Sequence, residues 1–568
     1  MKTSFWRSIS PQSGRNHVAA GLWVLGLAGW LVLFTLGLVG YSGSKIAYTL
    51  FSMATGVMLL TGLRQTTSYG YLFLTVFLWL GFWLKLTIHT VLSYPFVEPV
   101  GSFLGGAGAW DEVLNTASVA SLGVMLGKIL FDRLASRIKP RRSEKEPAVP
   151  RWYGQNRKWF WAGLIVASAA ALLVNMKYGV HQIGLPPRTI LMWPLNAVVA
   201  WMLNIGMATG VAVFVWWDIG LKRNVMFPLG AIIAEAFLSS VSVLSRAVYV
   251  FHAIPQFWAV NRFKKILNGW SHAKTALVAT LFVLFLVVSL SAVTTFRNYL
   301  YQSDVYSSTA YQVAYAEWEV LTVHIERAEL ALKNAPLADR PELLKKLNAM
   351  KARLRELEEI LVREKAKWQE ALNSGSMETM VLLNEFGYQM SSGFLTRILQ
   401  LSVDRWIGLE GVMAVQSYPE KKMSLLWHGV SGKQEFGKPD VYQSVSKSIY
   451  LKSDSSKYRF RTLPGAVAFL YYGNSLWIVM IGMAFFSAAV LAVEFFINVL
   501  TANPIICSLY GALVASNVAQ FGGSPRESGP YIFMLACGLI LIWIVSSNFF
   551  VLTLQKLRMM KTAESNGI

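Results

Sequence analysis

The sequence predicts an all-α protein: a polytopic integral membrane helical bundle of about 10–12 spans, with an extracytoplasmic insert containing an antiparallel coiled-coil hairpin. Three observations predict this class. The 568 residues are 54% hydrophobic and only 15% charged, with a mean hydropathy of +0.43, whereas soluble chains carry about 25% charged residues. Apolar runs long enough to cross a bilayer recur along the chain. Basic residues gather in several of the segments between them.

Candidate spans in the first half are apolar runs of about 20 residues, at roughly 18–40, 45–63, 70–91, 113–131, 159–176 and 190–217. The first run follows a basic flank, as in a secretory signal peptide. It is too long for one and no small-residue cleavage site follows, so we expect an uncleaved helix. Residues 132–158 carry nine Lys or Arg against three Asp or Glu, which predicts a cytoplasmic loop. Four spans precede it, so the N-terminus is predicted to be cytoplasmic too.

Residues 225–253 decide the topology of the second half. As one span they would place the basic stretch 261–265 outside, against the positive-inside rule. As a broken or re-entrant hairpin they keep that stretch inside, and the helix 275–293 then exits. The second count starts from the basic C-terminal tail, which should be cytoplasmic. Three spans precede it, at about 475–499, 503–518 and 530–553, and they place residues 297–460 outside. Both counts agree only if 225–253 turns back on itself, with Glu235 and Arg246 toward its outer tip.

The chain is therefore expected to have three parts: an N-terminal transmembrane bundle (1–296), an extracytoplasmic insert (297–460) and a C-terminal transmembrane bundle (461–568). Within the insert, 311–372 contains two runs with apolar residues at alternating spacings of three and four, the pattern of a coiled-coil seam. Pro341 at the break between them indicates a new helix start. We expect a hairpin with a longer arm of about 48 Å, which either is purely structural or docks a partner or second copy.

Composition and motifs argue against several classes of function. The formal net charge is +21, but the basic residues are scattered between apolar runs, a pattern that fits anionic lipid headgroups better than nucleic acid. Both cysteines, Cys507 and Cys537, lie in apolar spans, which indicates no disulfide framework. The seven histidines lack metal-ligand spacing, and neither Asp-x-Asp nor Gly-x-Ser-x-Gly occurs. We therefore expect no metal, no cofactor and no nucleic-acid partner.

The segment 385–460 is the best candidate for chemistry, because charged residues stand there among apolar residues and glycines on the predicted outer side. Arg397 and Arg405 are eight residues apart, so they share a face of a helix, with Asp404 beside that face. Glu410 lies between two glycines, which allow a ligand or another backbone to approach closely. A carboxylate near apolar surface is a candidate base.

Arginine and carboxylate chemistry extends beyond that segment. The planar guanidinium binds phosphate bidentately and stays charged, and the candidates are Arg246, Arg397, Arg405, Arg459 and Arg461. Each could equally be a snorkelling or ion-paired arginine, and Arg246 could pair with Glu235. His428 is a reserve base, and Glu98, Asp111 and Glu112 are lesser acids. Tyr388, Trp406, Tyr418 and Tyr471 are candidate platforms for sugar rings, although aromatics also line membrane interfaces.

The second half carries a series of recognisable motifs. Arg459-Phe-Arg461-Thr-Leu-Pro464-Gly465 leads into an apolar run with Tyr471-Tyr472-Gly473, where Pro-Gly predicts a re-entrant or interfacial helix. Asn503-Pro504, Tyr510-Gly511 and Phe521-Gly522-Gly523 follow. In this order, after a many-spanning bundle and a large outer loop, the chain resembles the bacterial polysaccharide repeat-unit polymerases of the Wzy type, which make O-antigen and exopolysaccharide. The coiled-coil hairpin departs from the usual pattern of that family.

The resemblance implies a metal-independent membrane glycosyltransferase, a polymerase or the related ligase, in the bacterial inner membrane. It moves a growing glycan from one undecaprenyl-diphosphate carrier to the repeat unit on another at the outer face. It implicates Arg246, Arg405 and Arg461, and less directly Arg397 and Arg459, in holding the diphosphate. The implied partners are lipid-linked oligosaccharide donor and acceptor, membrane lipids and, at the hairpin, polysaccharide-assembly proteins.

The alternative is a non-enzymatic protein: a transporter of lipid-linked oligosaccharide or an assembly scaffold. A transporter is expected to carry more charged residues within its spans than this chain does, where Lys85, Glu235, Arg246 and Glu494 are the main ones. Composition therefore favours the enzyme.

Overall fold

The computed structural model contains helices and connecting loops, with no strand among the residues it describes. These are 16–64, 68–92, 96, 98–136, 149–221, 226–262, 271–301, scattered residues between 314 and 333, 340–373, 403, 406–432, 440–447, 462–521 and 525–546. The predicted all-α class is confirmed.

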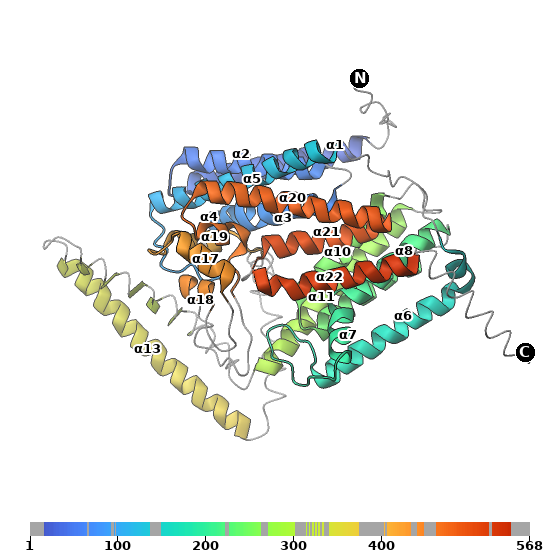
Figure 1. The fold of residues 1–568 in the computed structure, drawn as a ribbon. Helices are drawn as coiled ribbons and strands as arrows, with labels where there is room; N and C mark the ends of the chain where they lie inside the picture. The colour runs from blue at the N-terminus through green and yellow to red at the C-terminus, as the bar shows by residue number, and fades with distance from the viewer. Residues whose placement is uncertain are drawn as a thin grey trace, which may run out of the picture.

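The first half of the chain supplies most of the bundle (Figure 1). Its helices are α1 (Asn16–Gly40), α2 (Lys45–Arg64), α3 (Tyr69–Trp79), the π-helix η1 (Leu80–Leu84), α4 (Lys85–Leu92), α5 (Ala107–Ala135), α6 (Arg151–Tyr178), α7 (Leu195–Trp201), the π-helix η2 (Met202–Gly206), α8 (Met207–Gly220), α9 (Met226–Ser242), α10 (Arg246–Arg262) and α11 (His272–Tyr301).

The second half adds the insert and closes the bundle (Figure 1). Its helices are α13 (Arg340–Asn373), α16 (Leu409–Gln416), α17 (Met423–Ser431), α18 (Val441–Ser446), α19 (Gly465–Tyr471), α20 (Leu476–Thr501), α21 (Pro504–Ala519) and α22 (Pro525–Ser546). The four short helices α16–α19 gather at one end of the bundle, which we call the insert end.

Within the described part of the chain, seven helices are long and apolar enough to cross a membrane, at Lys45–Arg64, Tyr69–Leu92, Ala107–Ala135, Arg151–Tyr178, Leu195–Gly220, Ala273–Arg297 and Leu476–Thr501. Shorter apolar helices occupy Val24–Gly40, Met226–Ser242, Pro504–Ala519 and Gly529–Ile544. These positions follow the apolar runs of the sequence closely, because the thickness of the bilayer sets the length of each run. The protein is a multi-pass membrane protein.

The break predicted in 225–253 is present, and it lies at residues 243–245. Helices α9 and α10 flank it and pack against each other. Each has 17 residues, or about 25 Å at 1.5 Å per residue, so the hairpin is longer than the predicted segment. Its turn lies at the insert end, because Phe251 near the start of α10 packs edge-on against Phe77, which in turn stacks on Trp406 just before α16. At the turn, Ile183 N donates to Val243 O at 2.9 Å, and Arg297 Nη2, near the end of α11, donates to Ile183 O at 3.2 Å.

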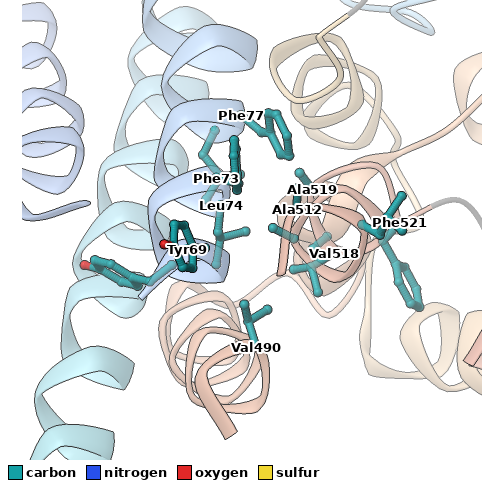
Figure 2. Close-up of a cluster of buried hydrophobic side chains, with 14 of the residues drawn as sticks. Tyr69, Phe73, Leu74, Phe77, Val490, Ala512, Val518, Ala519 and Phe521 are labelled. Atoms are coloured by element: carbon teal, nitrogen blue, oxygen red, sulfur yellow. The ribbon is translucent and has the colours of Figure 1, made fainter. Parts of the chain in front are cut away.

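Close backbone approach holds α5 against α20. A Cβ on Gly123 would lie 2.4 Å from the carbonyl oxygen of Met480, and one on Gly127 would lie 2.2 Å from that of Ala484. Glycines four residues apart are typical of helices that pack tightly within a membrane. Beside this contact, side chains of α3 meet those of α20 and α21 in a buried apolar cluster (Figure 2).

The loop predicted over 132–158 is shorter in the structure. Helix α5 continues to Ala135 and α6 begins at Arg151. The basic residue Arg157, counted from sequence as part of the loop, lies inside α6 and donates to Asp218 of α8 at 2.6 and 2.7 Å. Charge density identified a basic segment between two spans, but it could not separate loop residues from the first two turns of a helix.

In the insert, α13 is a 34-residue helix. The scattered described residues of 317–329 contact it through ion pairs: Arg353 Nε lies 2.8 Å from Glu317 Oε1, and Lys351 Nζ lies 2.6 Å from Glu329 Oε1. The hydrogen bond and ion pair to Arg353 lower the pKa of the Glu317 carboxyl. These residues are largely exposed, so the contacts orient the segments rather than stabilise them strongly.

Candidate functional site

Lys85 and Glu410 form an ion pair that joins the insert to the bundle. Lys85 is the first residue of α4, directly after η1, and Glu410 is the second residue of α16. Lys85 Nζ donates to Glu410 Oε1, and the two side chains are 0% and 3% exposed. A buried charge is costly unless it is paired, so the loss of either side chain would leave the other buried without its partner.

The backbone brings α16 to this position through close contacts on two sides. A Cβ on Gly81, within η1, would lie 2.4 Å from the carbonyl oxygen of Ile407, and one on Gly411 would lie 2.0 Å from that of Pro464. Next to them, Trp406 stacks on Phe77 of α3 with 5.5 Å between the ring centroids. The segment that begins at Trp406 therefore lies inside the bundle rather than on its surface. Its apolar residues pack there, and its one carboxylate meets Lys85.

A second polar cluster lies nearer the surface and consists of Glu112, Gln416, Lys421 and Tyr471. Glu112 of α5 accepts hydrogen bonds from Lys421 Nζ at 2.7 Å, from Gln416 Nε2 at 2.9 Å and from the Tyr471 hydroxyl. Lys421 also lies over the Tyr471 ring, 5.0 Å from its centroid. The Glu112 side chain is 41% exposed. This carboxylate is therefore paired but reachable, unlike Glu410.

The tyrosines of the site are held in their neutral form. Burial, followed by the hydrogen bond and the charge of Glu112, raises the pKa of Tyr471. Burial also raises the pKa of Tyr442 in α18, and the charges of neighbours, Tyr472 and Glu410 among them, raise it further. Both phenols therefore remain hydrogen-bond donors. The loop before α5 closes over α18, where Gly101 N donates to Ser446 O at 3.0 Å.

Among the described residues, this arrangement contains three of the candidates named from sequence: the carboxylates Glu410 and Glu112 and the aromatic Tyr471. His428 is exposed on α17. Tyr418 is half-buried just after α16 and packs against the apolar core. Arg246 is the first residue of α10 at the hairpin turn. Glu235 pairs with His252, whose Nδ1 lies 2.9 Å from its Oε1, so the Arg246–Glu235 pair considered from sequence is not the one that forms.

The other predicted site residues, Arg397, Asp404, Arg405, Arg459 and Arg461, lie outside the described residues. The same holds for the candidate aromatic platform Tyr388. Their roles remain predictions.

The three lesser acid candidates are all among the described residues, and Glu98 is partly buried in the loop before α5. Asp111 accepts from the Tyr41 hydroxyl at 3.0 Å and from Ser44 N at 2.9 Å, so it fixes the turn between α1 and α2. Glu112 belongs to the polar cluster described above.

The predicted Pro-Gly-led helix is present as α19, but all seven of its residues are buried. It therefore packs within the protein, and its re-entrant or interfacial position in the membrane stays a prediction. Gly465 has a φ of +76° and its N–H donates to Phe521 O at 3.0 Å. A left-handed backbone of this kind favours glycine. This geometry turns the chain into α19, and from there Tyr471 reaches Glu112.

Sequence reasoning missed Gln416 and Lys421 and gave Lys85 no role. Lys85 is 325 positions from Glu410, and Lys421 is 309 from Glu112. The available signal was a lysine within an apolar run, which by itself marks a candidate functional residue. Among the described residues, no group of three or more His, Cys, Asp or Glu side chains is arranged to hold a metal ion.

Comparison with known proteins identified no relative of this chain. The chain has no significant match to a protein-family model, to a curated protein or to a solved structure.

Proposed function

We propose that this protein is a membrane glycosyltransferase that polymerises undecaprenyl-diphosphate-linked oligosaccharide repeat units into O-antigen or exopolysaccharide. In this proposal it acts at the outer face of the bacterial inner membrane. The observation that carries the proposal is the convergence of two lysines, two glutamates and a tyrosine at the insert end, from α4, α5, α16, α19 and the segment before α17. Cations, a reachable carboxylate and neutral phenols are the groups that transfer from a lipid diphosphate requires.

The proposed reaction assigns each group a task. A hydroxyl of the acceptor sugar attacks the anomeric carbon of the donor, the bond from that carbon to the diphosphate oxygen breaks, and the lipid diphosphate leaves with the electron pair. The proton of the hydroxyl passes to a base. Glu112, which is 41% exposed, is better placed for this task than Glu410, which is enclosed and paired with Lys85. Glu410 then acts as a positioning residue for α16, and His428 remains a reserve base.

The negative diphosphate needs cations that stay charged. Lys421 lies beside Glu112, and Arg246, Arg397, Arg405, Arg459 and Arg461 are the proposed diphosphate ligands. The hairpin of 311–372, with α13 as its longer arm, is proposed to dock assembly proteins of the same pathway. Its support is the set of contacts from α13 to Glu317 and Glu329.

The test uses purified protein in liposomes with undecaprenyl-diphosphate oligosaccharide, and laddered products are the readout. Glu112→Gln is expected to slow the ladder by about 10²–10⁴-fold, the usual contribution of a general base. Arg405→Ala combined with Arg461→Ala is expected to abolish it. Glu420→Gln, an exposed carboxylate in the same segment, is the matched control and retains the ladder. No ladder with the unmodified protein, or an undiminished ladder in the arginine variant, contradicts the proposal.

A transporter of lipid-linked oligosaccharide is the second candidate, because the bundle encloses more charged side chains than the sequence indicated. They are Lys85, Lys128, Asp218, Glu235, Glu410 and Glu494. Each has a protein partner, which favours a structural role for them and hence the enzyme. Accumulation of the oligosaccharide on the opposite side of the liposome membrane, without any ladder, would favour the transporter instead.

A further inference from the structure

A second buried polar group lies between helices α9 and α10, and the proposed glycan transfer assigns it no task. His252 Nδ1 of α10 is 2.9 Å from Glu235 Oε1 of α9, and the Ser239 hydroxyl donates to the same oxygen at 2.8 Å. The His252 and Glu235 side chains are 2% and 5% exposed. Two titratable groups enclosed in a membrane bundle are a candidate functional pair.

The contacts determine how many protons this pair holds. His252 Nε2 lies 3.0 Å from the carbonyl oxygen of Asn204, which only accepts hydrogen bonds, so Nε2 carries a proton. The contact between Nδ1 and Oε1 requires one more proton, on either atom. The pair is an imidazolium with a carboxylate or a neutral imidazole with a carboxylic acid, and both forms have no net charge. Loss of that proton would leave a buried negative charge, which is costly.

The other carboxyl oxygen marks where a further proton can bind. Glu235 Oε2 is buried and accepts no hydrogen bond from the described residues. The same is true of Gln256 Oε1, one turn after His252 on α10. A proton on Glu235 Oε2 leaves the existing contacts intact, because His252 Nδ1 and Ser239 Oγ continue to donate to Oε1.

A chain of hydrogen bonds connects the pair to the insert end. Asn204, whose carbonyl faces His252, also places its side-chain Nδ2 3.0 Å from His181 Nε2. His181 is half-buried in the loop between α6 and α7, and burial lowers the pKa of its imidazole. The neutral ring therefore accepts at Nε2. Asn204 lies within η2, and π-helical turns of this kind are frequent at functional sites.

We propose that Glu235 and His252 form a proton-binding site inside the membrane bundle, with Glu235 Oε2 as the atom that takes the added proton and Asn204 and His181 as its connection to the insert end. The proposal does not depend on glycan transfer. Several titratable and charged groups whose side chains are described lie on α10 itself and on the elements packed against the hairpin. They are Arg246, Tyr249 and Arg262 of α10, Arg151, Tyr153, Arg157, Lys158, Lys177 and Tyr178 of α6, Asp218 of α8, Lys274 and Arg297 of α11, and Cys507 and Tyr510 of α21.

Infrared difference spectroscopy of the full-length protein in liposomes tests this site, because a protonated carboxyl has its own carbonyl stretching band. On acidification, the unmodified protein and the exposed control Glu420→Gln are expected to show a band that Glu235→Gln lacks. His252→Gln is expected to show the band at a higher pH than the unmodified protein, because the carboxylate has lost its cationic partner. A purely structural role for His252 would not move the band.

Two results would overturn the proposal. One is a set of acid-induced bands in Glu235→Gln identical to that of the unmodified protein; the other is an unshifted band in His252→Gln. If Glu235→Gln does not fold, Ser239→Ala takes its place. That change removes one donor to Oε1 and keeps both titratable groups, so it too should move the band to higher pH, and an unmoved band in it counts against the site.

Discussion

At the scale of single residues, the main feature is how the charges inside the bundle are paired. Lys85 with Glu410, Arg157 with Asp218 and His252 with Glu235 are each formed between different helices. Removing one member of such a pair leaves an uncompensated charge, whereas replacing both with apolar residues of similar size is often neutral. Each pair therefore adds little to stability compared with apolar residues of similar size, but neither of its members can be removed alone without a large cost.

Lys85→Met tests the pair that joins the insert to the bundle. We expect it to lower the free energy of unfolding in detergent by about 3–5 kcal/mol, because Glu410 remains buried without its cation. Lys85→Met combined with Glu410→Met should recover most of that loss. Equal destabilisation in the single and double variants would show that the two residues are not coupled.

The matched control for this measurement is Lys346→Met. Lys346 pairs with Glu342 one helical turn away on α13, and their side chains are 67% and 75% exposed. Solvent screens such a pair, so we expect no measurable change in unfolding.

At the scale of elements, α16 occupies its place because a glycine meets a neighbouring backbone. Gly411→Ala would put a Cβ 2.0 Å from the Pro464 carbonyl oxygen, so α16 and α19 must move apart. We expect a loss of about 1–3 kcal/mol in unfolding free energy together with a weakened glycan ladder. Gly163→Ala on α6 is the control, since a Cβ there would meet no atom within 4 Å, and it should be neutral or stabilising by up to about 1 kcal/mol. Similar losses in both variants would contradict this account.

Glu494 of α20 caps the start of α3. Its carboxylate accepts from Tyr69 N and Gly70 N, both at 2.7 Å, and from the Ser68 hydroxyl at 2.9 Å. Glu494→Ala leaves these buried donors unsatisfied, and we expect it to cost about 1–3 kcal/mol in thermal or denaturant unfolding. Glu494→Gln keeps one acceptor oxygen and should cost less. If Glu494→Gln costs more unfolding free energy than Glu494→Ala, burial of the side chain matters more than its capping hydrogen bonds.

The elements were largely predictable from the sequence, and the site was not. The length and apolarity of a span are local properties set by the bilayer, so runs such as 45–63 and 70–91 correspond closely to α2 and to α3–α4. The break near 243–245 was predictable from charge alone, because an unbroken helix would have reversed the sidedness of a basic segment. The depth at which α16 and α19 lie was not, because apolar short helices look alike at an interface and inside a bundle.

At the scale of the whole molecule, the arrangement of α9 and α10 as a hairpin sets which ends of the helices share a side. Lys265→Cys should therefore resist a membrane-impermeant maleimide in right-side-out vesicles, whereas Glu420→Cys in the insert should react. In inverted vesicles, Lys265→Cys should react and Glu420→Cys should resist labelling. Both variants are made in a chain in which Cys507 and Cys537 are replaced. Labelling of Lys265→Cys from the outside would exclude this topology.

The sequence by itself determined the class of the protein, the positions of its spans, and the need for a chain reversal within residues 225–253. These follow from short-range composition and from the distribution of Lys and Arg on either side of a bilayer. Only the tertiary structure decided that Glu410 meets Lys85, that Glu112 meets Lys421 and Tyr471, and that Glu235 meets His252. The physical reason is that buried charges take the partner that helix packing brings near, and no local pattern records which helix that is.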